Sequence, residues 1–221
     1  MRKQAINIFA VIALCTAVIG CKKAKEANTS EAEAAAVTES TTVKYVANVA
    51  ESTINWKGFK PTGTHNGTVN IESGIFHLDN GSLQSGTFLI DMKSISATDL
   101  DGEMKDKLDA HLKGTVEGKE GDFFNVTKFP SGGFEITGTT TEAGKTMLSG
   151  NLSLKGNKHN VTFPVTVDTD GDLITITSEA FTIDRTKWGI NYGSKSIFDN
   201  LGDKFINDEM ELQITIKAKK A

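Results

Sequence analysis

The sequence contains few of the residues that usually carry chemistry. Only four His and two Cys occur in 221 residues. The histidines, His65, His77, His111 and His159, are scattered singly, with no two-His helical spacing and no partner Cys pair, so the pattern does not favour a metal centre. The sequence has no G-x-S-x-G elbow, phosphate-binding loop or dinucleotide fingerprint. We therefore expect no metal and no cofactor. The sequence also does not identify a nucleophile together with a base that could activate it.

An excess of positive charge is also absent, since 28 Asp and Glu outnumber 24 Lys and Arg. The formal net charge is -4, and a mature chain without Arg2 and Lys3 would carry about -6. A negatively charged surface repels phosphate backbones, so we expect no nucleic-acid partner. Lys22 and Lys23 form a local exception, which either favours anionic lipid headgroups or is simply solvated.

Long apolar runs are absent except at the N-terminus. There Met1-Arg2-Lys3 precedes the run AINIFAVIALCTAV, and VIGC follows at once. The run is short for a membrane span and fits the core of a signal peptide. Its ending resembles the lipobox of bacterial lipoproteins, which would make Cys21 the acylated first residue of the mature chain. The alternative is an ordinary secretory peptide that leaves Cys21 free. Cys15 leaves with the signal peptide, so no disulfide is expected.

Three parts follow: a signal peptide over 1–20, a lipidated Cys with a disordered tether over 21–42, and a folded domain over 43–221. The tether has no aromatic residue and one β-branched aliphatic residue, so it buries too little surface to order itself. As a flexible coil it would extend about 25 Å. Acyl chains on Cys21 would anchor the protein to a membrane without a spanning helix. Lys22 after the Cys resembles lipoproteins sent to the outer membrane, facing the periplasm or the cell surface.

Beyond Val43, apolar and polar residues alternate with the two-residue period of half-buried strands. The clearest examples are HNVTFPVTVD at 159–168 and the final stretch at 210–218. Hairpin signals separate such segments at Asn80-Gly81, Ala143-Gly144, Gly156-Asn157 and Asp170-Gly171. The last pair lies in DTDGD, which resembles half of a calcium loop but lacks the later Glu, so a turn is favoured.

An open antiparallel sheet of about eight strands must pack on another layer or close on itself. The sequence has one helical pattern, TDLDGEMKDKLDAHLKG, which we expect to start at a cap on Thr98 or Asp99 and to end at Gly114. One short helix cannot cover such a sheet. We therefore predict an all-β fold, an antiparallel up-and-down barrel of about eight strands with one short α-helix.

The alternation places one set of apolar side chains inside this barrel. They are Ile54, Trp56, Phe88, Ile90, Met92, Leu152, Leu154, Val161, Phe163, Ile174, Ile176, Ile214 and Ile216. A barrel of this size is either filled by side chains or holds one small ligand, and composition does not decide between them. Glycines on the strands, such as Gly67 and Gly150, either leave room inside or relieve curvature.

Three stretches together resemble the YceI-like family of bacterial secreted proteins. They are STINWKGFKPTGTHNGTV (52–69), FLIDMKSISATDLD with LDAHLKG and DFFNVTKFP (88–130), and FTIDRTKWGI (181–190). The hairpin GNLSLKGNKHNVTFPV (150–165) fits too, and the resemblance covers nearly all of 44–219. It implies a lipocalin-like barrel with an internal tunnel that binds amphiphilic lipids such as polyisoprenoids and is not an enzyme.

This resemblance and the lipobox at Cys21 together lead us to expect a lipid-anchored barrel of the cell envelope that binds or carries a polyisoprenoid-like lipid, with the inward residues lining the tunnel. Polar groups at the tunnel mouth would orient the lipid head. Our candidates for the mouth are His65, Arg185, Trp188, Asn191 and Tyr192. For Arg185 the alternative is a structural role, either an ion pair with a carboxylate or a cap on strand-end carbonyls, and for Trp188 it is a place in the core or in a plug. Two other functions stay open, an enzyme that uses His65 or His77 as general base and a filled barrel that binds a protein partner.

Overall fold

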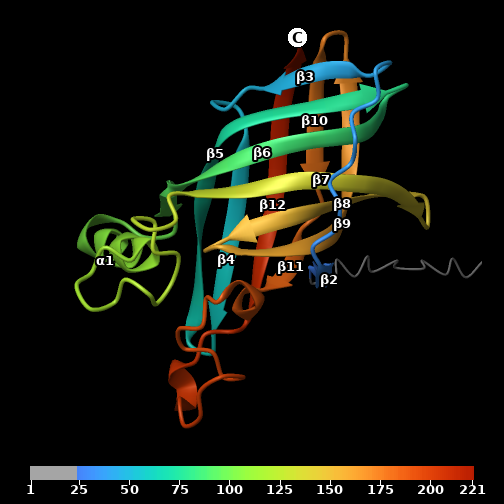
Figure 1. The fold of residues 1–221 in the computed structure, drawn as a ribbon. Helices are drawn as coiled ribbons and strands as arrows, with labels where there is room; N and C mark the ends of the chain where they lie inside the picture. Colours follow the sequence, from blue (N-terminus) through green and yellow to red (C-terminus); the bar gives the residue numbers. More distant parts are fainter. Residues whose placement is uncertain (1–23) are drawn as a thin grey trace, which may run out of the picture.

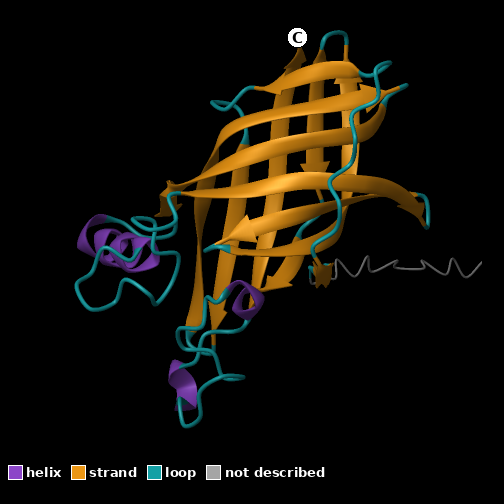
Figure 2. Ribbon diagram, viewed as in Figure 1, coloured by secondary structure: helices purple, strands orange, loops and turns teal. Residues whose placement is uncertain are grey.

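The computed structural model describes residues 24–221 and shows strands wrapped into a barrel, with one helix at its periphery (Figure 1, Figure 2). The predicted signal peptide and Cys21 lie outside the described residues. Within residues 24–221, no helix is long and apolar enough to cross a membrane. The elements in chain order are β1 (Lys25–Glu26), β2 (Asn28–Glu31), β3 (Val43–Ala47), β4 (Thr53–Lys60), β5 (Gly63–Asp79), β6 (Ser82–Ala97), α1 (Gly102–Lys113), β7 (Ser131–Glu142), β8 (Lys145–Leu154), β9 (Asn157–Asp170), β10 (Leu173–Ser178), β11 (Phe181–Asp184), the 3₁₀ turns η1 (Arg185–Trp188) and η2 (Gly202–Lys204), and β12 (Glu209–Lys220).

Eight strand positions form the wall of the barrel. Neighbours pair antiparallel in the order β5, β6, β7, β8, β9, β10, β12, and the ring closes through β3 and β4, each of which pairs with both β12 and β5. β11 continues the position of β10, because both pair with β12 along different stretches. The predicted all-β barrel of about eight strands is therefore confirmed.

Hairpin turns form at, or one residue away from, the four predicted pairs. Asn80-Gly81 joins β5 to β6 and Ala143-Gly144 joins β7 to β8, with positive φ at both residues of each turn. The other two turns lie one residue away from the predicted pairs, at Lys155-Gly156 and Gly171-Asp172. Each turn sets the register that places alternate side chains of its two strands inside the barrel.

The helix starts later than the sequence indicated. α1 begins at Gly102, so the predicted start at Thr98 or Asp99 is wrong, whereas the predicted end at Gly114 is confirmed by its left-handed cap. The carboxylate of Asp99 instead accepts a backbone N–H of β5 at 3.0 Å. Asp109 of α1 accepts a backbone N–H of β6 at 2.7 Å, which fastens the helix to the edge of the barrel.

Residues 25–31 form part of the barrel wall, so the prediction of a disordered tether is wrong for this segment. β1 pairs with β11 and β2 pairs with β9, whereas β9 and β11 do not pair with each other. Ala27, between β1 and β2, is 7% exposed and joins the core. The segment fills a gap in the wall, and its partners lie more than a hundred residues away in the chain.

Beyond β2 the chain crosses the outer face of the barrel, running over β9, β8 and β7 toward β3 in Figure 1. Asn151 of β8 anchors it, because its side-chain amide accepts the N–H of Glu33 at 2.9 Å and donates to the carbonyl of Glu33 at 2.7 Å. The N–H of Ala36 donates to a carbonyl of β7 at 2.9 Å, and the hydroxyls of Thr38 and Ser85 lie 2.8 Å apart. Asn151 and Ser85 are each only 2% exposed. Both lie next to inward-facing residues in their strands, so their own side chains face out of the barrel.

Candidate functional site

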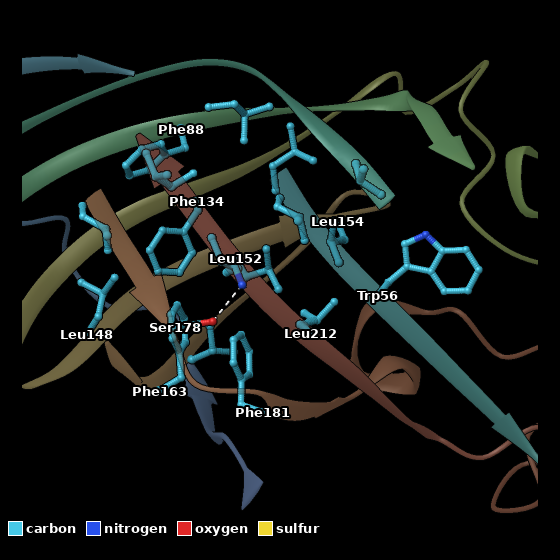
Figure 3. A pocket seen from close by; sticks show the side chains of 18 of the residues that line it. Trp56, Phe88, Phe134, Leu148, Leu152, Leu154, Phe163, Ser178, Phe181 and Leu212 are labelled. Atoms are coloured by element: carbon cyan, nitrogen blue, oxygen red, sulfur yellow. Dashed lines mark hydrogen bonds between the residues drawn. The ribbon is translucent and has the colours of Figure 1, made fainter. Parts of the chain in front are cut away.

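The barrel encloses an apolar cavity of about 100 Å³. Side chains from β4 through β12 line it, together with Phe124 from the loop after α1 (Figure 3). No lining residue in the described part of the chain is charged. Typical ligand pockets measure about 300–1,000 Å³, so a long apolar ligand must displace lining side chains. Met92 and Met210 are the most adaptable of these, since their unbranched side chains change shape easily.

Most of the side chains predicted to face inward do line this cavity. They are Ile54, Trp56, Phe88, Ile90, Met92, Leu152, Leu154, Val161, Phe163, Ile176, Ile214 and Ile216. Ile174 is buried at 1% exposure but does not line it. The role of these residues as ligand contacts stays a prediction, whereas their place around one cavity is now observed.

Sequence reasoning missed a second group of lining residues. They are Val69, Ile71, Leu83, Ile95, Phe124, Phe134, Leu148, Val165, Ser178, Phe181, Met210 and Leu212. Several continue an alternation already recognised, as Leu212 continues that of Ile214 and Ile216. Phe124 comes from an irregular loop, where no periodic pattern points to an inward side chain.

Aromatic rings occupy much of the space beside the cavity. Phe163 of β9 stacks on Phe181 of β11, with ring centroids 4.2 Å apart and planes 5° from parallel. Phe134 tilts against Phe163 at 5.8 Å. Gly150 makes room for Phe134, because a Cβ at this position would come within 2.2 Å of the ring. The space that Gly150 leaves inside the barrel is therefore occupied by the Phe134 ring.

Two lining side chains carry polar atoms, Trp56 and Ser178. The Ser178 oxygen accepts the backbone N–H of Ile214 at 2.8 Å, the dashed line in Figure 3. The indole nitrogen of Trp56 is buried and has no hydrogen-bond partner among residues 24–221. The lining therefore contains two side chains with polar atoms and is otherwise apolar.

Arg185 holds a loop closed and does not line the cavity. Its side chain is 4% exposed in η1. The guanidinium donates to three backbone carbonyls, those of Asn207 (3.0 Å), Ile190 (2.5 Å) and Ile206 (3.1 Å). Burial lowers the pKa of Arg185, and the carboxylates of Asp208 and Asp184 oppose that shift, so the group stays charged. The structure supports the structural role that the sequence left open for Arg185.

Trp188 is also part of this closure. It is fully buried, and its indole N–H donates to the carbonyl of Leu152 at 2.9 Å. Lys155, in the β8–β9 turn, reinforces the junction by donating to the carbonyls of Gly121 at 2.6 Å and Gly189 at 2.9 Å. Burial lowers the pKa of Lys155, and a neighbouring carboxylate opposes the shift. Trp188 is therefore a core residue, which was the alternative to a place at the tunnel mouth.

The other three mouth candidates also lie outside the cavity lining. His65, near the start of β5, forms a 2.9 Å contact with a carboxylate. Tyr192 packs its ring on His111 and Phe123, with centroids 4.9 and 5.3 Å away. Asn191 is half-buried, and its side-chain oxygen lacks a partner within the described chain. The structure thus does not gather the five predicted mouth residues around the cavity.

None of the four histidines, all of which lie in the described chain, lines the cavity. His77 lies on β5 opposite Ser85 of β6. His159 contacts a backbone carbonyl of η1 at 3.0 Å. Neither His65 nor His77 therefore lies where a general base for a ligand in this cavity would have to stand. Among residues 24–221, no three His, Cys, Asp or Glu side chains form a group that could hold a metal ion.

A family model described as the YceI-like domain matches residues 45–218. The chain belongs to the YceI-like family. The resemblance found in the sequence is thereby confirmed. The wall segment 25–31 precedes the matched range, so the match to the YceI-like domain does not include it. No curated protein sequence matches the chain.

Two solved structures share the barrel of this YceI-like protein. BcnA from Burkholderia cenocepacia is 22% identical, with a TM-score of 0.55 over 78% of this chain and 99% of BcnA. A polyisoprenoid-binding domain from Saccharophagus degradans, implicated in plant cell wall breakdown, is 11% identical, with a TM-score of 0.57 over 81% of this chain and 99% of that domain. At such identities the likeness shows the fold.

Proposed function

We propose that this YceI-like protein binds an amphiphilic, isoprenoid-like lipid in the barrel and carries it at a membrane of the cell envelope. The observation that carries the proposal is the cavity lining, which is apolar and, within residues 24–221, free of charged side chains. Burying apolar surface stabilises a bound lipid by about 25 cal/mol per Å². The polyisoprenoid-binding description of the Saccharophagus degradans domain supports the ligand class.

The site supports binding over catalysis. The hydroxyl of Ser178 is the one candidate nucleophile among the lining residues of the described chain, and its oxygen accepts a backbone N–H. No His, Asp, Glu or Lys of residues 24–221 lines the cavity to serve as its base. The cavity itself also supports a ligand-binding barrel over a filled one that only binds a protein partner.

Protein purified from its native membrane is expected to retain lipid. Native mass spectrometry should show a species heavier than the apo chain by the mass of a lipid, and organic extraction should remove that mass. Delipidated protein should then take up a prenyl lipid. A protein that carries no lipid, and that after delipidation binds neither prenyl nor fatty ligands, would exclude the proposal.

Two neighbouring residues of β9 provide a matched pair for this test. Val165 lines the cavity, whereas Thr166 is exposed on the other face of the strand. Val165→Phe fills part of the cavity and is expected to lower lipid uptake at least tenfold, because displaced side chains have less room. Thr166→Phe adds the same ring outside and should leave uptake unchanged. Equal uptake by both variants would place the lipid elsewhere.

We further propose that acylated Cys21 anchors the barrel, on the outer membrane facing the periplasm or on the cell surface. Since Lys25 is already paired in the wall, four residue steps separate it from Cys21. Fully extended, these steps reach at most about 14 Å. The anchor would therefore hold the wall near β1 close to the membrane, nearer than the coil of about 25 Å that the sequence suggested.

Cys21→Ala is expected to move the protein from the membrane fraction to the soluble fraction. Two or more acyl chains give stable anchoring, and their loss leaves only weak electrostatic attraction from Lys22 and Lys23. The control is the double variant Lys22→Ala and Lys23→Ala, which keeps the Cys and should stay membrane-bound. Retention of Cys21→Ala on membranes after a high-salt wash would contradict the anchor.

A further inference from the structure

Trp56 holds a buried donor that nothing in the described chain satisfies. It lies on β4, between Gly67 of β5 and Leu212 of β12, and is 8% exposed. Its indole nitrogen has no hydrogen-bond partner within residues 24–221. Trp188, the other tryptophan, donates to the carbonyl of Leu152 at 2.9 Å. Of the two indole N–H groups, only that of Trp56 lacks a hydrogen-bond partner within residues 24–221.

The backbone around Trp56 fixes the position of its ring. A Cβ at Gly67 would lie 1.9 Å from the carbonyl oxygen of Ser96 and 2.7 Å from the indole Cζ2, so the ring can rest on β5 only because position 67 is glycine. In Figure 3, Trp56 stands at one end of the lining, and the side chains of Phe88, Phe134, Phe163 and Phe181 gather away from it. The donor therefore marks one end of an apolar site.

An unpaired donor at this position calls for a partner. A buried N–H without an acceptor costs the free energy of a lost hydrogen bond, and native proteins keep few of them. Water is a poor acceptor here, because a buried water needs two to four polar neighbours. Apart from Trp56, the lining of the described chain offers only Ser178, whose oxygen already accepts a backbone N–H. A bound ligand can supply the missing acceptor.

We propose that Trp56 determines the head-group specificity of the cavity: its indole N–H donates to a neutral acceptor oxygen, a hydroxyl or a ketone, on an isoprenoid chain that extends toward the phenylalanines. This inference rests on the proposed function and narrows its ligand class. A charged head such as a diphosphate is disfavoured inside, because no Lys, Arg or His in the described chain lines the cavity to pair with it.

The test compares three ligands of equal chain length: geranylgeraniol, geranylgeranyl diphosphate and a C20 isoprenoid hydrocarbon. The protein is the mature chain with Cys21→Ser, which keeps every described residue. Geranylgeraniol is expected to bind about tenfold more tightly than the hydrocarbon, the value of one net hydrogen bond. The diphosphate should bind more weakly than the alcohol. In Trp56→Phe, the alcohol and the hydrocarbon should bind equally.

Phe88→Leu is the matched control, because it also removes a lining ring but no donor. It should weaken both ligands alike and keep the tenfold preference for the alcohol. The indole resonances of ¹⁵N-labelled protein give a second readout. Geranylgeraniol should move the Trp56 indole proton downfield and slow its exchange, and the already bonded Trp188 indole should hardly change.

The outcomes separate this inference from the proposed function. If the protein binds none of the three ligands, both the proposed function and the inference are wrong. If alcohol and hydrocarbon bind equally to the unsubstituted cavity, or Trp56→Phe keeps the preference, the inference is overturned and lipid binding stands. Should Trp56→Phe fail to fold, the Trp56 resonance decides, because an unmoved indole proton on binding geranylgeraniol also overturns it.

Discussion

Arg185→Ala is expected to lower the free energy of unfolding by about 3–5 kcal/mol, because it leaves three buried or half-buried carbonyls without their donor and removes the guanidinium beside the Asp208 carboxylate. The carbonyls belong to the loop that follows η1, and Asp208 lies 3.8 Å from the guanidinium. For a domain of this size the loss corresponds to a fall in Tm of about 6–20 °C. Chemical and thermal denaturation measure both values.

Two variants show whether Arg185 acts through its hydrogen bonds. Arg185→Lys keeps the charge but cannot reach three carbonyls, so its stability should fall between those of Arg185→Ala and the native protein. Lys187→Ala changes an exposed cation of the same turn and should alter the free energy of unfolding by less than about 0.5 kcal/mol. At a temperature where Arg185→Ala is folded, lipid affinity should be unchanged. Lost lipid with unchanged stability would instead make Arg185 a ligand contact.

The barrel could be predicted because its signals are local. The alternation at 159–168 assigns inward and outward faces from neighbouring residues alone, and a turn such as Asn80-Gly81 needs only two residues to set the register of its strands. Once one strand has an inward face, its whole apolar row lines the interior. For that reason the same pattern predicted both the fold and half of the cavity lining.

The remaining features depend on contacts between distant residues, which no local pattern records. Arg185 shows nothing in its own stretch that separates a ligand contact from a structural group, because two of its three carbonyl partners arrive with the return of the chain at 206–207. The late start of α1 has the same origin, because the Asp99 carboxylate accepts a backbone N–H of β5 instead of capping the helix. Trp56 was predicted to face inward, but the absence of an acceptor for its N–H could be found only in three dimensions.

The wall segment 25–31 is the largest departure from the sequence prediction, and Ala27→Asp tests it. Ala27 is the buried residue of this polar segment, and a carboxylate there cannot remain charged in the core at low cost. We expect the segment to leave the wall while the rest of the barrel stays folded. Hydrogen exchange at the β9 residues that pair with β2, 159–162, should then become about 10- to 100-fold faster.

Ser30→Asp provides the control, because it introduces the same charge at an exposed position of β2 and should leave exchange at 159–162 unchanged. The consequence reaches the cavity, since Val161 lines it and pairs with Thr29 of β2. Detaching the segment removes one side of the wall beside Val161, so lipid release from Ala27→Asp should also be faster. Unchanged exchange at 159–162 in both variants would mean that the segment does not hold the wall, and β9 would then have to be protected by pairing with another strand.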